Sequence, residues 1–255
     1  MPDLARPFRI IAHRGASAYA PENTMAAFRR AVEMGCTEVE TDVCLTRDGH
    51  LLLLHDDTLD RTTNGAGRAE DLTLDELKRL DAGSWTDPLL SWDRDYRGER
   101  LITLQELLDE FGDRLTCHVE IKNPMPGLVP AVVAAIAERD LIDHVFIAAV
   151  NDDTSLQEAI RLAPGIRTAS APVDLLRAEG PAAIRHCAER GYSMVTLAAF
   201  NQTRELVDLA HSLGMEARSS GIRNRAQMIE AADIGCNGMT INWPDWLMDH
   251  VRDRG

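Results

Sequence analysis

The sequence predicts an α/β chain that closes into one eight-stranded (β/α)₈ barrel, the TIM-barrel architecture. Amphipathic helical patterns, each followed by a glycine and a short β-prone run, recur around Gly35, Gly191, Gly214 and Gly235. Such alternation indicates parallel strands joined by helices. About eight such units in 255 residues match the usual length of the barrel. A doubly wound open sheet stays the alternative, because periodicity does not give strand order.

The expected strands are short β-prone runs, each followed by a helical pattern. They lie near residues 8–12, 38–44, 116–121, 145–149, 166–170, 193–197, 215–219 and 238–241. After Thr203, the residues Leu206, Leu209, Ala210 and Leu213 recur at helical spacing. This spacing predicts a helix that packs one apolar face on the outside of the sheet.

A long irregular segment at about residues 61–100 interrupts the alternation after the second strand region. It contains "RTTNGAG" and "DAGSWTDP", which are rich in turn residues, and it is too long for an ordinary βα connection. We expect a small insertion over the mouth of the barrel. The leucine run at 51–54 before it predicts a short buried strand. No linker marks a second domain, so residues 1–255 are expected to form a single domain.

Composition narrows the range of functions. The formal net charge of −14 disfavours binding to nucleic acid and to anionic bilayers, although a local basic pocket could still hold one phosphate. The chain contains no apolar run long enough for a membrane span, and its first residues lack a signal-peptide pattern, so a cytoplasmic protein is expected. Five cysteines without a CxxC pair predict reduced core thiols. The oligomeric state does not follow from these features.

Three carboxylates are the first candidates for chemistry. Glu40 and Asp42 lie two apart on an expected strand, so both side chains face the same way, while Val39 and Val43 face the helices. Two like charges inside a barrel favour a hard divalent cation between them. Glu120 ends the next barrel strand and is expected beside Asp42. These three residues therefore predict a metal site, with a solvated edge strand as the alternative.

Other charged residues are expected to surround this metal site. Lys122 follows Glu120 on the same face, where it could hold a phosphate oxygen, although an isolated E-x-K is more often a surface ion pair. Glu38 lies deeper on its strand and could pair with a cation.

Two histidines are candidates for proton transfer. His13 stands at the carboxyl end of the first strand, where barrel enzymes place catalytic groups, and His55 emerges from the leucine run opposite it. Near a bound phosphodiester, one histidine can take a proton from the attacking hydroxyl while the other protonates the leaving alkoxide. For His13 alone, a role in capping a loop is the alternative. The other histidines are expected to be structural or solvated.

Several motifs, in order through the first half of the chain, resemble the glycerophosphodiester phosphodiesterase family. They are "AHRGASAYAPENTMAAF", "EVETDVCLTRDGHLLLLHDDTLDRTTNGAG", "TLDELKRLDAG", "ITLQELL" and "VEIKNP". The resemblance implies a β/α barrel that hydrolyses glycerophosphodiesters to glycerol 3-phosphate and an alcohol. It also implies a Ca²⁺ or Mg²⁺ cofactor, an acid/base pair and phosphate-contacting residues. The positions that match are Glu40, Asp42 and Glu120 as metal ligands, His13 and His55 as the pair, and Arg14 and Lys122 as phosphate contacts.

The second half departs from the family pattern. Ser220 and Gly221 stand where the family commonly has Trp and Thr, and Asn242 replaces an acid. Loss of an aromatic surface and an acid predicts weaker binding of choline, and Arg223 adds a cation near the rim as a candidate substrate-binding residue. Arg218 shares the face of Ser220 and could instead pair with a buried carboxylate such as Glu38.

Two other functions stay open. One is a phospholipase D-like member of the same superfamily that acts on lysophospholipids, for which the sequence offers no membrane-docking stretch. The other is a barrel that binds phosphodiesters without cleaving them, which the intact histidine pair disfavours. The expected partner is a small-molecule phosphodiester substrate.

Overall fold

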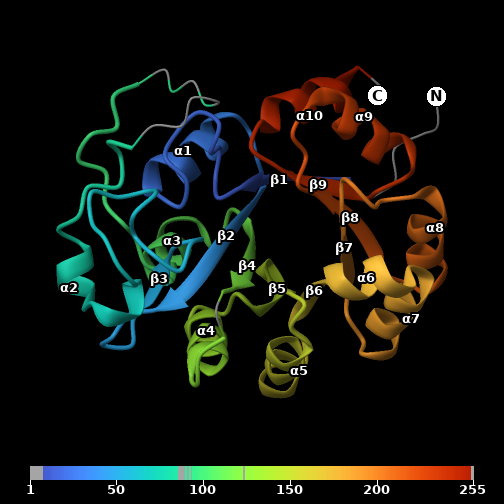
Figure 1. Cartoon of the computed structure of the whole chain (residues 1–255), viewed down its shortest axis with the longest axis horizontal. Coiled ribbons are helices and arrows are strands. Elements are labelled where there is room, and N and C mark those ends of the chain that lie inside the picture. The colour runs from blue at the N-terminus through green and yellow to red at the C-terminus, as the bar shows by residue number, and fades with distance from the viewer. Residues whose placement is uncertain (1–7, 86–89, 91, 93, 123, 254–255) are drawn as a thin grey trace.

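The computed structural model describes residues 8–85, 90, 92, 94–122 and 124–253, and in that part of the chain eight parallel strands form a closed barrel (Figure 1). The order around the barrel is β1-β9-β8-β7-β6-β5-β4-β2, and pairing of β1 with β2 closes it. This closure rules out the open sheet. The strands are β1 (Arg9–His13), β2 (Glu38–Leu45), β4 (Thr116–Ile121), β5 (Val145–Val150), β6 (Arg167–Ala171), β7 (Met194–Ala198), β8 (Glu216–Ser220) and β9 (Gly238–Ile241). Each expected strand is confirmed to within one residue at either end.

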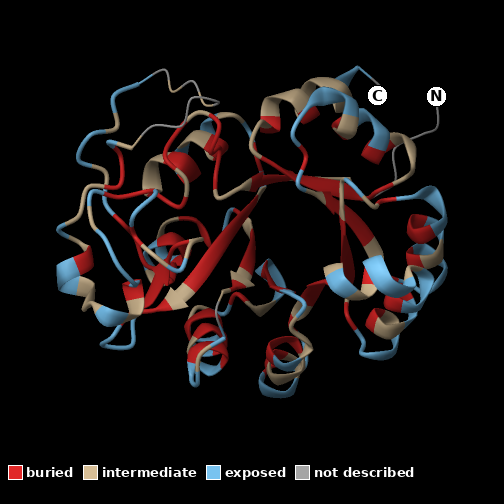
Figure 2. Ribbon diagram, viewed as in Figure 1, coloured by how far each residue is buried: buried red, intermediate tan, exposed pale blue. Residues whose placement is uncertain are grey.

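Helices surround the barrel, with their exposed faces turned outward (Figure 2). Among the described helices, none has the length and apolar character that crossing a membrane requires. They are α1 (Met25–Glu33), α2 (Leu74–Leu77), α3 (Leu104–Phe111), α4 (Leu128–Ala137), α5 (Asp153–Leu162), α6 (Val173–Glu179), α7 (Pro181–Glu189), α8 (Arg204–Ser212), α9 (Arg225–Asp233) and α10 (Pro244–Arg252), with 3₁₀ turns η1 (Ala69–Asp71) and η2 (Ile142–His144).

Local signals explain where these helices begin. The side chain of Thr24 accepts a hydrogen bond from the backbone of α1, and Thr103 with Glu106 forms a capping box at α3. In α8, Leu206 and Ala210 are buried as expected. The expectation for Leu213 was wrong, because the helix ends at Ser212 and Leu213 is 39% exposed.

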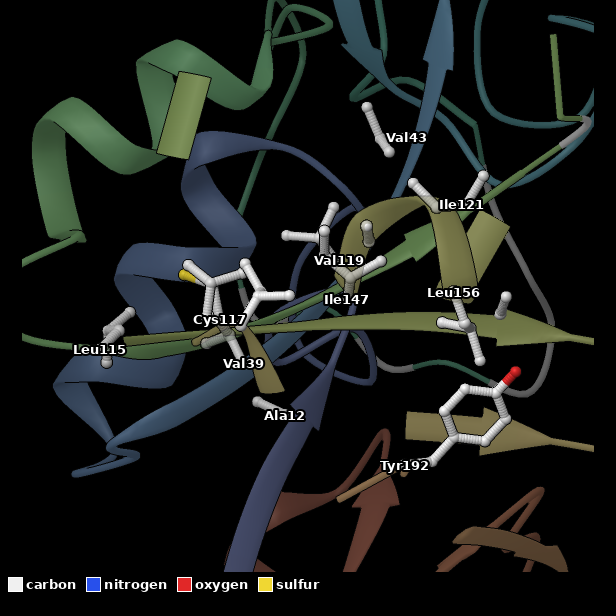
Figure 3. Packing of buried hydrophobic residues seen from close by; sticks show 14 of the residues in the cluster. Ala12, Val39, Val43, Leu115, Cys117, Val119, Ile121, Ile147, Leu156 and Tyr192 are labelled. Carbon is white, nitrogen blue, oxygen red and sulfur yellow. The ribbon is translucent and has the colours of Figure 1, made fainter. Parts of the chain in front are cut away.

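The main hydrophobic core lies between the strands and the helices. Outward-facing side chains such as Val39, Val119 and Ile147 are fully buried there (Figure 3). All five cysteines are free, and four of them are buried, while Cys44 is only partly buried. Because apolar side chains fill the outer face of each strand, the inward face is left to polar and charged residues at many positions.

The segment between β2 and α3 has a small core of its own. The leucine run forms β3 (Leu51–Leu53), which pairs antiparallel with β2. Leu52 of this strand is buried in a separate cluster with Leu54, Leu59, Leu77 and Leu101, whereas its two neighbours in β3 pack into the main core. Part of the expected insertion, residues 86–89, 91 and 93, lies outside the described residues. Cys44 of β2 packs against this cluster, and Arg61 binds Glu22 and Asp56. The position of the whole insertion over the mouth stays a prediction.

Candidate active site

A cavity of about 310 Å³ opens at the carboxyl ends of the barrel strands. This is the end at which barrel enzymes carry their active sites. Seven of the eight residues expected in the site line it: His13, Arg14, Glu40, Asp42, His55, Glu120 and Lys122. The eighth, Arg223, is exposed and is not among the lining residues, so its role stays a prediction. A larger hollow of about 740 Å³ elsewhere on the surface contains none of these residues.

Strand register brings the three carboxylates together. Glu40 pairs with His13 of β1, and Asp42 pairs with Glu120 of β4. One oxygen from each of the three carboxylates lies within 4.8 Å of the others. Burial and the neighbouring charges of Asp42 and Glu120 raise the pKa of Glu40 well above its usual value. Three crowded carboxylates of this kind fit a hard divalent cation, which would relieve their repulsion.

Cations and an amide hold these carboxylates in place. Asn23 donates to Asp42 Oδ2 over 3.0 Å, and Arg14 Nε lies 3.2 Å from the same oxygen. Lys122 Nζ lies 2.9 Å from Glu120 and 3.8 Å from Asp42. Although burial alone would lower the pKa of Lys122, the two carboxylates raise it, so its ammonium stays charged. Both cations expected to contact phosphate therefore face the cavity beside the acidic residues.

The His-Arg-Gly turn after β1 is fixed by close packing. Arg14 has a left-handed φ of 56°, which is costly for a residue with a side chain, and its backbone N–H donates to Glu40 Oε2 over 3.1 Å. Gly15 follows with a φ of 79°. A Cβ at Gly15 would lie 2.6 Å from the backbone of Ala27, so only glycine fits. Tight contact between this turn and α1 thus aims His13 and Arg14 at the cavity.

His13 is held as a neutral imidazole. Its Nδ1 lies 2.6 Å from Oδ1 of Asn242, and its Nε2 lies 3.8 Å from Glu40. Burial, followed by the charge of Arg14, lowers the pKa of His13 to about 4. Because the amide oxygen accepts the Nδ1 hydrogen, Nε2 carries the lone pair. The sequence assigned Asn242 only to substrate choice and missed this contact, which joins residues at opposite ends of the chain.

His55 is oriented by a network of charged groups. Its Nδ1 lies 2.6 Å from Asp56, which Arg61 holds at 2.6 Å. Arg61 also donates to Glu22, and Glu22 accepts from Arg14 on the other side. Burial would raise the pKa of Glu22, but the hydrogen bonds from Arg61 and the charge of Arg14 lower it to about 2. The two histidines are thus linked through Arg14, Glu22, Arg61 and Asp56.

Sequence reasoning missed Glu22, Asn23 and Arg61 as parts of the site. Glu22 and Asn23 lie in the "PENT" part of the first quoted motif, so the motif itself was the available signal. Arg61 opens the irregular segment, and its position gave no sign of its contacts. Glu38 pairs with Arg9 at 2.8 Å, as expected for a cation partner. The alternative pairing of Arg218 with Glu38 is indirect, because His118 lies between them.

Carboxylates, cations and a lone-pair imidazole in one cavity are suited to binding a phosphoryl group and moving protons around it. A closed (β/α)₈ barrel with this cavity at the carboxyl ends of its strands is a barrel enzyme with a candidate site for phosphoryl transfer to water. This class is what the fold and the site define.

Comparison with known proteins gives the family. The model of the glycerophosphoryl diester phosphodiesterase family matches residues 13–246. A glycerophosphodiester phosphodiesterase of Caldanaerobacter subterraneus subsp. tengcongensis is 36% identical, over 96% of this chain and 98% of its own. One from Bacillus subtilis is 33% identical, over 95% of this chain and 87% of its own. The chain belongs to the glycerophosphoryl diester phosphodiesterase family and is a phosphoric diester hydrolase.

A solved structure is similar over almost the whole chain. It is an Oleispira antarctica phosphodiesterase in complex with the product sn-glycerol 3-phosphate, with a TM-score of 0.79 and 26% identity. The alignment covers 99% of this chain and 97% of that chain. The two proteins therefore share the barrel fold.

Proposed function

We propose that this enzyme hydrolyses glycerophosphodiesters to glycerol 3-phosphate and an alcohol, with a divalent cation, Mg²⁺ or Ca²⁺, as cofactor. The observation that carries the proposal is the convergence of Glu40, Asp42 and Glu120, whose carboxylate oxygens lie within 4.8 Å of one another in a cavity that two cations and two histidines also line. The product bound to the similar Oleispira phosphodiesterase supports the same substrate class.

The three carboxylates would hold the cation. When bound, it would neutralise charge on the phosphoryl oxygens. Arg14 and Lys122 would bind the remaining phosphoryl oxygens and orient the phosphorus atom toward the attacking group. Both are already fixed by carboxylates, so little side-chain ordering is needed when the substrate binds.

His13 is the proposed general base, because its Nε2 carries a lone pair and Asn242 holds the ring. Nε2 takes the proton of the attacking hydroxyl, which belongs either to water or to the glycerol part of the substrate. The new P–O bond forms as the bond to the alcohol breaks. His55 acts in this step as an imidazolium, whose Nδ1–H is donated to Asp56, and it gives its Nε2 proton to the departing alkoxide, which leaves the neutral ring. If the glycerol hydroxyl attacks first, water opens the cyclic phosphate in a second step.

The test is turnover of purified protein on glycerophosphodiesters, with release of glycerol 3-phosphate as the measurement. We expect activity with Mg²⁺ or Ca²⁺, and loss of activity in excess EDTA or in Asp42→Ala. Full activity of Asp42→Ala in EDTA would remove the metal from the mechanism. Binding of glycerol 3-phosphate without any turnover by the wild type would instead favour a barrel that only binds phosphodiesters.

One observation favours a second substrate class, the lysophospholipids. Val150 at the end of β5 is 43% exposed and lines the cavity, and Phe200 after β7 is 64% exposed. Exposed apolar side chains near the mouth could contact an acyl chain. Comparing kcat/KM for a lysophospholipid with that for its deacylated counterpart decides between them, and Phe200→Ser should lower only the former.

A further inference from the structure

Polar residues cross the barrel interior beneath the cavity. Arg218 on β8 reaches toward His118 on β4, which lies on the far side of the barrel in the strand order. Arg218 Nη1 lies 3.0 Å from His118 Nδ1, and His118 Nε2 lies 2.8 Å from Glu38. A guanidinium can only donate, so His118 Nδ1 accepts from Arg218, and the ring hydrogen on Nε2 is donated to Glu38.

Arg218 is buried, and it forms no ion pair with the described residues. The residue is 3% exposed, and no carboxylate among the described residues lies within 4 Å of it. Nε donates a hydrogen bond to Thr196 over 2.7 Å, and Nη1 donates one to His118. Nη2 makes no hydrogen bond with the described residues, and it is not sealed off from solvent. Both groups that contact the guanidinium are neutral, so Nη2 is free to donate to an anion that enters the cavity.

The Arg218 side chain is part of the lining of the cavity described above. Arg218 lines it together with Arg14 and Lys122, which approach from β1 and β4. Glu40 and Glu120 are near enough to act on Arg218 electrostatically but do not contact it. If a divalent cation occupies the carboxylates, their negative charge is no longer available to Arg218. The cavity then carries an excess of positive charge, which an anion would balance.

We propose that Arg218 is a further substrate-binding residue that donates from Nη2 to an anionic oxygen of the phosphoryl group. The assignment rests on the proposed phosphodiesterase function. In this arrangement the phosphoryl group is bound from two sides, by Arg14 and Lys122 at the mouth and by Arg218 from the floor. His118 and Thr196 act as positioning residues, because they fix the plane of the guanidinium.

The test is calorimetric binding of inorganic phosphate, glycerol 3-phosphate and glycerol to the metal-loaded wild type and to Arg218→Met. Loss of a charge-assisted hydrogen bond should lower the affinity for inorganic phosphate and for glycerol 3-phosphate by about 10- to 100-fold and leave the affinity for glycerol unaffected. Removing a cation near Glu40 and Glu120 should leave the affinity for Mg²⁺ or Ca²⁺ unchanged or tighter. Arg167→Met is the matched control, because Arg167 lies at the other end of its strand and does not line the cavity.

Each other outcome has a clear meaning. If Arg218→Met binds inorganic phosphate as tightly as the wild type but binds glycerol 3-phosphate less tightly, the assignment to the phosphoryl group is overturned. Parallel loss of metal and phosphate affinity with a lower melting temperature would show a structural role and also overturn it. If Arg218→Met does not fold, Arg218→Lys should keep metal affinity but bind phosphate less tightly than wild type, and equal phosphate affinity would refute the proposal. Turnover by the wild type is measured separately, so that failure of the proposed function is distinguished.

Discussion

Replacing Glu40 by Gln should stabilise the metal-free enzyme. Glu40 is 2% exposed and lies beside Asp42 and Glu120, so its charge is repelled twice within the barrel. Glutamine has nearly the same shape, and its side-chain oxygen can still accept the backbone N–H of Arg14. The substitution therefore removes the repulsion while keeping the packing.

The magnitude follows from the geometry. Two unit charges 4.8 Å apart repel by about 3.5 kcal/mol at an effective dielectric constant of about 20. Glu40 takes part in two such repulsions, and attraction to Arg14 and Arg218 offsets part of them. A net gain of about 1–3 kcal/mol in the free energy of unfolding remains, which corresponds to a rise of about 3–10 °C in Tm.

Calorimetry in EDTA and with added Mg²⁺ or Ca²⁺ measures this effect. The wild type should gain about 2.7 kcal/mol when the metal is at about 100 times its Kd, whereas Glu40→Gln should gain much less. Glu22→Gln is the matched control, because the Glu22 side chain is also largely covered, at 9% exposed, but lies between Arg14 and Arg61. The same chemical change there breaks ion pairs and should lower Tm, at a cost of about 3 kcal/mol.

Two results would refute this reasoning. One is a lower Tm for Glu40→Gln than for wild type in EDTA, since repulsion among the carboxylates would then not be the dominant interaction. The other is equal stabilisation of wild type and Glu40→Gln by the metal, which would show that Glu40 is not a ligand.

Three further predictions concern catalysis, acid stability and substrate choice. His13→Ala and His55→Ala should each lower kcat by about 100-fold or more. The double variant should lose much less than the product of the two single losses, because the two groups act in one transition state. Near-wild-type turnover of either single variant would exclude that residue from the mechanism. Because the folded-state pKa of Glu22 is about 2 and its ordinary value is 4.5, its contribution of roughly 3 kcal/mol is present above pH 4.5 and is lost as the pH falls toward 2. Urea unfolding across this pH range should show that the free energy of unfolding falls less steeply with pH in Glu22→Gln than in the wild type. An identical fall in both proteins would contradict this role of Glu22. Glycerophosphoglycerol and glycerophosphoinositol should have higher kcat/KM than glycerophosphocholine. Arg223→Ala should reduce the ratio of these kcat/KM values to that of glycerophosphocholine. A preference for glycerophosphocholine would show that Ser220 and Arg223 do not set the choice of substrate.

Much of the site could be predicted because strand periodicity is a local property. Alternation along β2 placed Glu40 and Asp42 on one face, and the structure has both facing the cavity. Pairing of Asp42 with Glu120 followed from the assumption that β2 and β4 are neighbours, which the register confirms. Arg223 could not be placed in this way, because it lies beyond the end of β8, where alternation no longer applies.

The sequence by itself determined the strands, the inward and outward faces of each strand, and the residues available for chemistry. These properties depend on residues near one another in the chain, and a period of two residues encodes them directly. Only the tertiary structure decided that β1 pairs with β2, that Asn242 holds His13, and that Arg218 crosses to His118. Each of these contacts joins segments far apart in the sequence, and barrel closure is what brings such segments to a common axis. The period of a strand predicts which face a side chain occupies, whereas its contacts across the barrel depend on how the barrel closes.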